Sequence, residues 1–314
     1  MMEQKIAFSH RYGPAQFWRR IVQWPIAKIL HRRGLEHSAS GRRQLLIFSF
    51  DVIGQQINIE GAYEARELET LLAWLPASGD GAFDGTALDI GANIGNHTLF
   101  FAEHFRKVIS FEPNPRTFQV LGFNTSETPN VECSNIGLSD APGTASLSSH
   151  PNNVGGSRLA AASDGGVIPV TIDTVDAVVG EQEPVRLIKI DVEGHEAQVI
   201  RGAERTIRSN KPVILFEQHL DDFKDGKSSV IELLRTYGYQ RFATIKPYPR
   251  ADRLGRLGNG MVAVIGRALF GETMKVAFSE TIQPGFHSFL IAAPDWLKPV
   301  GADHANLPES GAVS

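Results

Sequence analysis

The sequence places one acid and two glycines at the end of a short apolar run. The segment DIGANIGN over residues 89–96 begins with Asp89 and spaces Gly91 and Gly95 four residues apart. Glycines let the backbone approach a ligand closely, and a helix that starts there offers unpaired N–H groups. This spacing differs from the G-x-G-x-x-G pattern of dinucleotide folds, and Asp89 would repel a pyrophosphate. The segment therefore favours a ligand that carries a cationic group.

A second acid follows the next apolar run. Glu112 comes directly after residues 107–111 and lies 23 residues beyond Asp89. An acid at the tip of the second strand holds ribose hydroxyls when a nucleoside crosses the edge of a parallel sheet. The structural alternatives are a helix cap for Asp89 and a solvated turn carboxylate for Glu112. Both acids together favour a nucleoside with a cationic group, such as S-adenosylmethionine with its methionyl ammonium.

Six segments together resemble the FkbM family of S-adenosylmethionine-dependent methyltransferases. They are GAYE (61–64), LDIGANIGNH (88–97), FEP (111–113), GLSD (137–140), IKIDVEGHE (188–196) and GA (202–203). The resemblance covers roughly residues 55–245, with a closing strand near 288–292. It implies a class I methyltransferase fold, an α/β Rossmann-like doubly wound sheet of seven strands whose last strand is antiparallel and inserted between the fifth and sixth. It also implies methyl transfer, most often to a hydroxyl of a natural product or of a sugar in a glycolipid.

The resemblance also assigns a cofactor role to individual residues. Those that would line the methionyl moiety of S-adenosylmethionine are Asp89, Gly91, Asn93, Gly95 and Asn96. Glu112 would hold the ribose, and Asp191 would close the pocket beside the sulfonium. Glu64 would lie near the cofactor pocket, and Asp140 is a candidate for the adenine edge.

A hydroxyl acceptor needs a general base, and the ionisable segment 189–196 offers two candidates. His195 is the first, because an unperturbed histidine titrates near neutral pH, and Glu193 is the second, as base or as orienter of the base. The structural alternative for His195 is that it caps a helix or bonds only to Glu196. A divalent metal held by Asp191, Glu193 and Glu217 is conceivable, but no contiguous run of ligands supports it, so we predict no metal site.

Two other classes of function remain open from the sequence. A methyltransferase acting on peptide or protein nitrogen would favour an N/D-P-P-Y tetrad after the fourth strand, which residues 191–194 do not provide. A cofactor-binding interaction module without catalysis is the other alternative, and the ionisable segment 189–196 argues against it. The acceptor, a small molecule or a glycan, is not readable from the motifs.

The motifs require elements that bring them to one edge of a sheet. Alternating strand and helix patterns predict parallel strands covered by helices on both faces. The predicted strands are 87–90, 107–111, 131–136, 187–190 and 213–217, with two closing strands at 241–246 and 288–292. Helices are expected at 64–74 and 230–237, a β-hairpin at 45–59, and a polar functional loop at 142–166. These patterns predict a methyltransferase domain over residues 44–300 with an insertion at 247–283, and a flexible tail at 301–314.

The N-terminal segment 1–43 is a basic extension. Residues 1–45 carry nine Lys or Arg against two Glu, a charge of +7. Since the whole chain has a net charge of −4, the other residues carry −11. The segment 17–33 reads as a basic helix that Pro25 would break or kink, either packed on the catalytic domain or lying on an anionic membrane. The acidic remainder argues against nucleic-acid binding. Cys133 is the single cysteine, so we expect a cytoplasmic location, with the inner membrane surface as an option.

Overall fold

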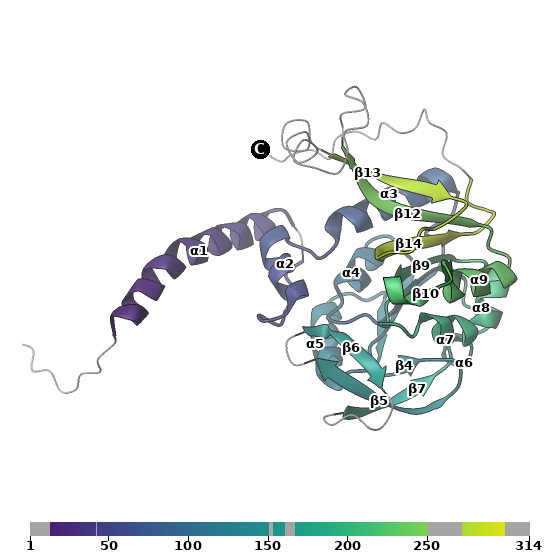
Figure 1. Cartoon of the computed structure of the whole chain (residues 1–314), viewed down its shortest axis with the longest axis horizontal. Coiled ribbons are helices and arrows are strands. Elements are labelled where there is room, and N and C mark those ends of the chain that lie inside the picture. The colour runs from purple at the N-terminus through teal and green to yellow at the C-terminus, as the bar shows by residue number, and fades with distance from the viewer. Residues whose placement is uncertain (1–12, 42, 151–152, 161–166, 250–271, 299–314) are drawn as a thin grey trace, which may run out of the picture.

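A mixed eight-stranded sheet forms the centre of the molecule, with helices on both faces (Figure 1). The computed structural model describes residues 13–41, 43–150, 153–160, 167–249 and 272–298. The strands of this sheet are β1 (Thr86–Ile90), β2 (Lys107–Phe111), β3 (Val131–Ser134), β8 (Val185–Ile190), β9 (Val213–Gln218), β12 (Arg241–Pro249), β13 (Glu272–Ser279) and β14 (His287–Ala293). Their order in space is β13-β12-β14-β9-β8-β1-β2-β3. The predicted doubly wound α/β sheet is confirmed.

The closing strand lies where the sequence predicted it. β14 runs antiparallel to both β9 and β12 and separates them. The number of strands differs from the prediction, because β13 adds an eighth strand at the edge, paired antiparallel with β12. β13 comes from the predicted insertion 247–283. Its Met274 and Val276, two residues apart, both pack against the core, which is the alternation of a half-buried strand. Residues 250–271 of that insertion lie outside the described residues, as does the predicted tail.

The helices divide between the two faces of the large sheet. They are α1 (Pro14–Ala39), α2 (Val52–Glu60), α3 (Ala65–Ser78), α4 (Asn96–Ala102), α5 (Pro115–Thr125), α6 (Val175–Val178), α7 (Glu196–Arg201), α8 (Glu204–Asn210) and α9 (Ser229–Thr236). Leu71 of α3 and Phe101 of α4 belong to one buried apolar cluster, and Val199, Ile207 and Leu234 of α7, α8 and α9 belong to another. Both faces are therefore covered, as parallel sheets require.

A second sheet corrects the prediction of a polar loop at 142–166. It contains β4 (Gly137–Leu138), β5 (Gly143–His150), β6 (Asn153–Ala160) and β7 (Val167–Asp173) in the order β4-β7-β5-β6. β5 pairs antiparallel with both β6 and β7. Leu147 and Val170 are buried, whereas serine, threonine and glycine fill five of the other seven positions of β5 and weaken the strand pattern there. A further hairpin joins β10 (Phe223–Lys224) to β11 (Lys227–Ser228), after a short turn of 3-10 helix at Leu220–Asp222.

The predicted hairpin at 45–59 is wrong, because residues 52–60 form helix α2. Gly54 lies inside this helix, and a Cβ there would come within 2.4 Å of the Phe48 carbonyl oxygen. The β-branched residues that suggested strands lie on this helix, and one of them, Ile57, is buried in the core. Gly61 ends the helix with a φ of 85°. Close packing on the preceding segment therefore overrides the local preference for strand.

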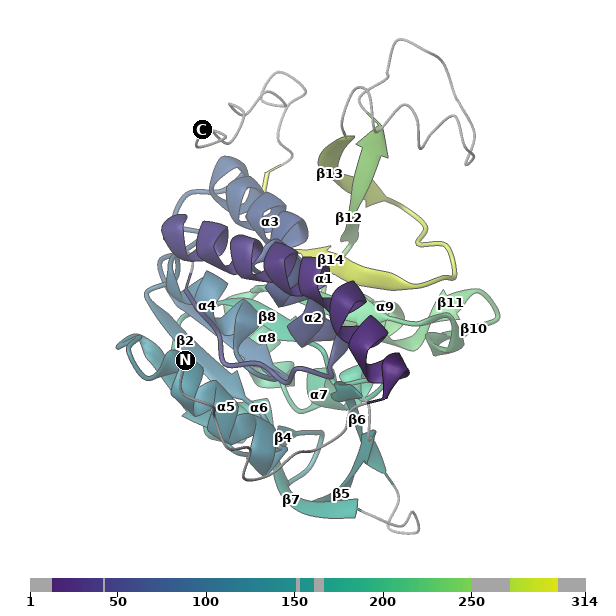
Figure 2. The same ribbon diagram turned by 90° about the vertical axis from the view of Figure 1, so that its left-hand side faces the viewer.

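The N-terminal helix α1 projects from the domain (Figures 1 and 2). It continues through Pro25 without interruption, and none of its residues is buried. Of the two alternatives for this segment, packing on the catalytic domain is therefore wrong for most of the length of the helix. Within the described part of the chain, no helix combines the length and apolar character needed to cross a membrane.

The junction between α7 and α8 tests how tightly these layers pack. A Cβ on Gly202 would lie 1.9 Å from the Ser139 carbonyl oxygen, whereas one on Gly122 of α5 would meet nothing within 4 Å. We expect Gly202→Ala to lower the free energy of unfolding by about 1–3 kcal/mol, as overpacking does. The matched Gly122→Ala should raise it by about 0.5–1 kcal/mol, because alanine favours helix. Urea denaturation measures both, and equal effects would contradict the packing described.

Candidate active site

A cavity of about 240 Å³ opens at the carboxyl ends of β1, β2, β8 and β9. One wall is apolar and contains Phe111, Ile136, Leu138 and Leu147. The polar groups of the lining are Tyr63, Asn93, Glu112, Asp191, Glu193 and Glu217. The first turn of α2 contributes Val52 and Ile53, so the N-terminal part of the chain helps to close the cavity.

The glycine loop after β1 forms the floor of this cavity. Gly91 has a φ of 77°, and a Cβ there would lie 1.8 Å from the Asp191 carbonyl oxygen. The backbone N–H groups of Gly91 and Ala92 both donate to the Phe111 carbonyl, each at 3.0 Å. Gly95, with a φ of 92°, leaves room for Leu121, which a Cβ would approach to 2.8 Å. Both glycines are required by close approach of their neighbours.

Glu112 is held by backbone donors at the tip of β2. Its Oε2 accepts from Asn93 N at 3.0 Å and its Oε1 from Asn114 N at 2.8 Å. The residue is 7% exposed. Burial raises the pKa of Glu112 to about 7, and the two backbone N–H donors oppose that shift. The carboxylate therefore faces the cavity in a fixed orientation and titrates near neutral pH.

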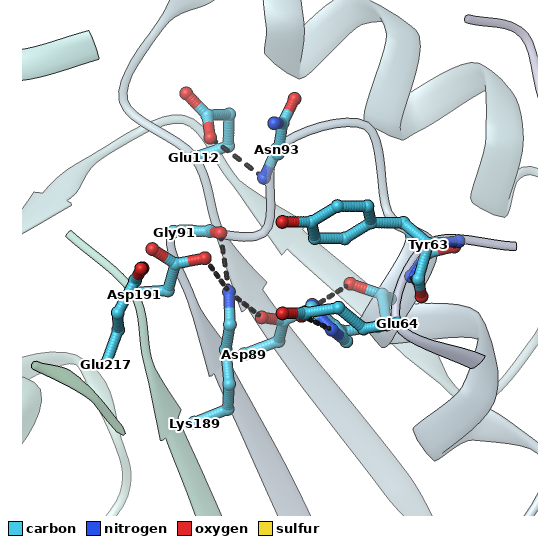
Figure 3. A network of polar contacts seen from close by, with 12 residues as sticks. Tyr63, Glu64, Asp89, Gly91, Asn93, Glu112, Lys189, Asp191 and Glu217 are labelled. Carbon is cyan, nitrogen blue, oxygen red and sulfur yellow. Dashed lines mark hydrogen bonds and ion pairs between the residues drawn. The ribbon is translucent and has the colours of Figure 1, made fainter. Parts of the chain in front are cut away.

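A buried ion pair joins β1 to β8 beneath the cavity (Figure 3). Asp89 and Lys189 are register partners on the two strands, and Lys189 Nζ lies 3.2 Å from Asp89 Oδ1. Asp89 Oδ2 accepts from Thr98 Oγ1 at 2.6 Å, and Lys189 Nζ also donates to the Gly91 carbonyl at 2.8 Å. Burial alone would lower the pKa of Lys189, but the neighbouring carboxylates outweigh it and raise that pKa. Asp89 is fully buried and lies under the loop instead of lining the cavity.

Asp191 and Glu217 form a carboxyl pair at the ends of β8 and β9. Asp191 Oδ2 lies 3.4 Å from Lys189 Nζ, and its side chain is hydrogen-bonded to that of Glu217. Burial and the charge of Asp191 raise the pKa of Glu217 to about 9. Burial opposes ionisation of Asp191, yet the positive charge of Lys189 and the Glu217 hydrogen bond lower its pKa overall. At neutral pH Glu217 therefore keeps the proton and donates it to an ionised Asp191.

The segment before α3 supports the same site from the other side. Tyr63 lines the cavity, and its backbone N–H and carbonyl bond to the Asn96 side chain at 3.0 and 2.9 Å. Glu64 has a φ of 52°, and its Oε2 lies 3.2 Å from His97 Nε2. Burial first, and the nearby carboxylates second, raise the pKa of Tyr63, so its hydroxyl stays protonated. Glu64 and Asn96 therefore bind residues beside the cavity and do not line it.

His195 and Asp140 are placed away from the cavity lining. His195 Nε2 bonds to Ser139 Oγ at 2.9 Å, and burial lowers the pKa of its imidazole. It occupies the N-cap position of α7 but makes no side-chain capping bond. Asp140 Oδ2 lies 3.4 Å from Arg201 Nε. Glu193, the other predicted base, lines the cavity with a φ of 55°.

The structure therefore brings together part of the predicted set. Five of the predicted residues line the cavity, namely Gly91, Asn93, Glu112, Asp191 and Glu193. Tyr63 and Glu217 also line it, although the sequence motifs assigned no role to Tyr63 and suggested Glu217 only as a metal ligand. Tyr63 stands inside the GAYE segment, which was a usable signal. The end of β9 carried no such signal beyond an acid after an apolar strand.

Comparison with known proteins relates the chain to methyltransferases. Residues 89–241 match the family model described as the methyltransferase FkbM domain. The chain is similar to the hexuronic acid methyltransferase AglP of Haloferax volcanii, with 32% identity over 134 residues that cover 42% of this chain and 55% of the relative. It is also similar to methyltransferase sdnD of Sordaria araneosa, with 27% identity over 154 residues that cover 37% of this chain and 60% of that protein. The matches thus span little more than half the length of these relatives.

Comparison with solved structures also finds a methyltransferase and an rRNA methylase. Methyltransferase FkbM from Methylobacillus flagellatus is 15% identical with a TM-score of 0.32, and the match covers 65% of this chain and 49% of that chain. An rRNA methylase from Streptococcus thermophilus is 15% identical with a TM-score of 0.37, and the match covers 73% of this chain and 97% of that chain.

The buried ion pair between Asp89 and Lys189 should contribute measurably to the stability of the protein. Lys189→Met leaves Asp89 without its partner in the core, so we expect the free energy of unfolding to fall by about 3–5 kcal/mol. The double variant Asp89→Asn/Lys189→Met buries no unpaired charge and should be destabilised by less than the sum of the two single variants. A double-mutant cycle in urea measures the coupling, expected above about 1 kcal/mol. Additive effects would show that the two groups do not interact.

Proposed function

Because the chain belongs to the FkbM family of methyltransferases, we propose that it transfers a methyl group from S-adenosylmethionine to a hydroxyl of a sugar, glycolipid or secondary metabolite. The observation that carries this proposal is the cavity itself. It combines the fixed carboxylate of Glu112, the glycine loop and an ionised Asp191 at the adjoining strand ends of a parallel sheet. Such an edge is where nucleoside ligands bind in doubly wound folds.

The lining fits S-adenosylmethionine group by group. The apolar wall of Phe111, Ile136 and Leu138 suits a flat base, and Glu112 suits two ribose hydroxyls. Asn93 Oδ1 is buried at the cavity and has no hydrogen-bond partner within the described residues. A buried acceptor without a partner is unfavourable, so a donor from a ligand would complete it. Asp191 supplies negative charge on the side of β8, where a cationic centre would be stabilised.

In this proposal Asp89 does not contact the ligand directly, because its side chain is buried beneath the glycine loop. Asp89 holds Lys189, and Lys189 in turn holds the Gly91 carbonyl and Asp191. The role that we propose for Asp89 is therefore to fix the floor of the cavity. Gly95, Asn96 and Glu64 have the same kind of role, since their contacts are with neighbouring chain segments. Asp140, which pairs with Arg201, stays a candidate for the outer edge of the adenine.

S-adenosylmethionine supplies an electrophilic methyl group when bound. The protein must then orient an acceptor hydroxyl, exclude water and remove a proton from that hydroxyl. We assign the proton to a carboxylate oxygen of Glu193, because Glu193 lines the cavity whereas the imidazole of His195 is bonded to Ser139. Glu217 keeps its own proton at neutral pH and so orients Asp191 without competing for the acceptor's proton.

The acceptor class rests on the relatives and on the polar side of the cavity. AglP is named as a hexuronic acid methyltransferase, and a sugar presents several hydroxyl donors. The carboxylates of Asp191 and Glu193 accept such donors. We therefore propose a hydroxyl of a sugar, a uronic acid first, as the acceptor to test.

The cellular setting follows from the same proposal. Cys133 is free and half-buried, which suits the reducing cytoplasm. We propose that residues 44–300 act as the catalytic domain there, with 1–43 as an extension. If the hydroxyl acceptor belongs to a glycolipid, methyl transfer would take place at the inner membrane surface.

Cofactor binding should depend on pH through Glu112. Ribose hydroxyls donate to the ionised carboxylate, so binding should lower the pKa of Glu112 below its free value of about 7. The ionised form binds, and affinity for S-adenosylhomocysteine should therefore rise by up to about tenfold per pH unit between about pH 5.5 and 7, then level off. Calorimetry measures this rise. Glu112→Gln should bind more weakly and lose the pH dependence, whereas the exposed control Glu127→Gln should keep it.

The two predicted bases can be separated by methyl transfer. Glu193→Gln should lower kcat by about 10²–10⁴, the usual contribution of a general base. His195→Ala should lower it by less than about tenfold, because its side chain lies outside the cavity lining. Transfer of a radiolabelled methyl group from S-adenosylmethionine to hexuronic acid glycosides and to polar-lipid extract measures both.

Binding of S-adenosylhomocysteine by both variants is the control for folding. Full activity in Glu193→Gln together with a large loss in His195→Ala would reverse the assignment of the base.

A further inference from the structure

The exposed apolar side chains of the protein are concentrated at its N-terminal end. Thirteen of the 18 large hydrophobic residues that are exposed in the described chain lie between residues 17 and 59. Nine of these belong to α1, a helix of 26 residues in which no residue is buried. Isolated exposed hydrophobic residues are ordinary, but a concentration of this kind marks an interaction surface.

Four of the nine exposed apolar residues of α1 lie with Pro25 along one side of the helix, whereas the other five are distributed around the rest of its circumference. Trp18, Ile21, Val22, Pro25 and Ile29 follow the spacing that aligns residues on one helical face. The exposed fractions of Trp18, Val22 and Ile29 are each 62%. We call this set the apolar face of α1.

The charge of α1 is opposite to that of the rest of the chain. The helix contains five Lys or Arg and one Glu, a net charge of +4. Since the whole chain has a net charge of −4, the residues outside the helix carry −8. At 100° per residue, Lys28 and Arg33 lie at the two edges of the apolar face, Arg19 lies beyond the edge formed by Arg33, and Arg32 falls within the angular range of the face, C-terminal to Ile29. An anionic surface would attract this helix and repel the acidic domain, which fixes which side of the protein approaches it.

The C-terminal end of α1 connects this surface to the cavity. His37 Nε2 contacts the Ile59 carbonyl of α2 at 3.2 Å, and Gly61 packs directly on the His37 ring. The other end of α2 lines the cavity with Val52 and Ile53, and Val52 is 62% exposed. Figure 2 shows α1 running across the same side of the molecule as α2. The apolar surface therefore extends from α1 to the rim of the cavity.

We propose that α1, with the exposed apolar residues Leu46, Phe50, Val52 and Ile59, docks on an anionic lipid bilayer. The apolar face enters the headgroup boundary, Trp18 occupies the interface, and the flanking cations meet lipid phosphates. Since α1 does not have the character of a spanning helix, it lies on the surface. Docking brings the rim of the cavity to the lipid headgroups, where a membrane-borne hydroxyl acceptor would be within reach.

Vesicle flotation of the full chain tests the docking. The protein should float with vesicles of phosphatidylcholine and phosphatidylglycerol and bind much less to pure phosphatidylcholine, with loss of binding as salt increases. Arg19→Gln/Lys28→Gln should reduce the partition coefficient about 30-fold, since each cation contributes about fivefold near an anionic surface. Trp18→Ser/Ile21→Ser/Ile29→Ser should reduce it at least about 100-fold. The matched control Phe123→Ser, on the exposed side of α5, should bind like the original protein.

Three outcomes would overturn the proposal. They are no flotation with the anionic vesicles, flotation that the α1 variants leave unchanged, and a dimer in light scattering that the α1 variants convert to monomer, which would make a second copy the occupant. Binding of S-adenosylhomocysteine should be equal in all variants, because none of the substituted residues lines the cavity. A failure of docking is thereby distinguished from a failure of the cofactor site.

Discussion

The ion pair between Asp89 and Lys189 is the contact on which the site depends. It joins the central strands β1 and β8 below the cavity, with both side chains removed from solvent. A charge buried there is tolerated only with a partner and further hydrogen bonds, and Thr98 and the Gly91 carbonyl provide them. Because Lys189 binds both the Gly91 carbonyl and the Asp191 carboxylate, one side chain sets the positions of two loops. Only glycine fits at position 91, because a Cβ there would lie 1.8 Å from the Asp191 carbonyl oxygen.

The second constraint is an excess of carboxylates around this one lysine. Asp89, Asp191 and Glu217 gather near Lys189, and their mutual repulsion is relieved because Glu217 keeps a proton to about pH 9. Glu112 adds another acid with a raised pKa at the far side of the cavity. A cationic, hydroxyl-rich ligand would satisfy both ends, which is the chemical reason for linking the cavity with S-adenosylmethionine. In the proposed function Asp191 would face the cation and Glu112 the hydroxyls.

The sequence predicted the central fold well because its strands are apolar runs that end at glycine, proline or an acid. Position at a strand end and the family resemblance together predicted that Gly91, Asn93, Glu112 and Asp191 would meet. It could not predict that Asp89 points under the loop, because that depends on its register with Lys189 of β8. The pairing of Asp191 with Glu217 likewise needs the order of β8 and β9. The hairpin prediction for α2 failed because β-branched residues are compatible with either element, and the contact of Gly54 with Phe48 decided the outcome.

Size alone would point to a different site, since a cavity of about 400 Å³ lies between α3 and α4, lined by Arg43, Leu72 and His104 among others. We propose instead that the cofactor binds in the smaller cavity beside Glu112. Hydrogen–deuterium exchange with and without S-adenosylhomocysteine distinguishes the two most directly. We expect slower exchange of backbone amides at residues 91–96, 111–114 and 190–194 on ligand binding. Unchanged exchange in these segments, or protection confined to residues around Arg43 and His104, would contradict the account.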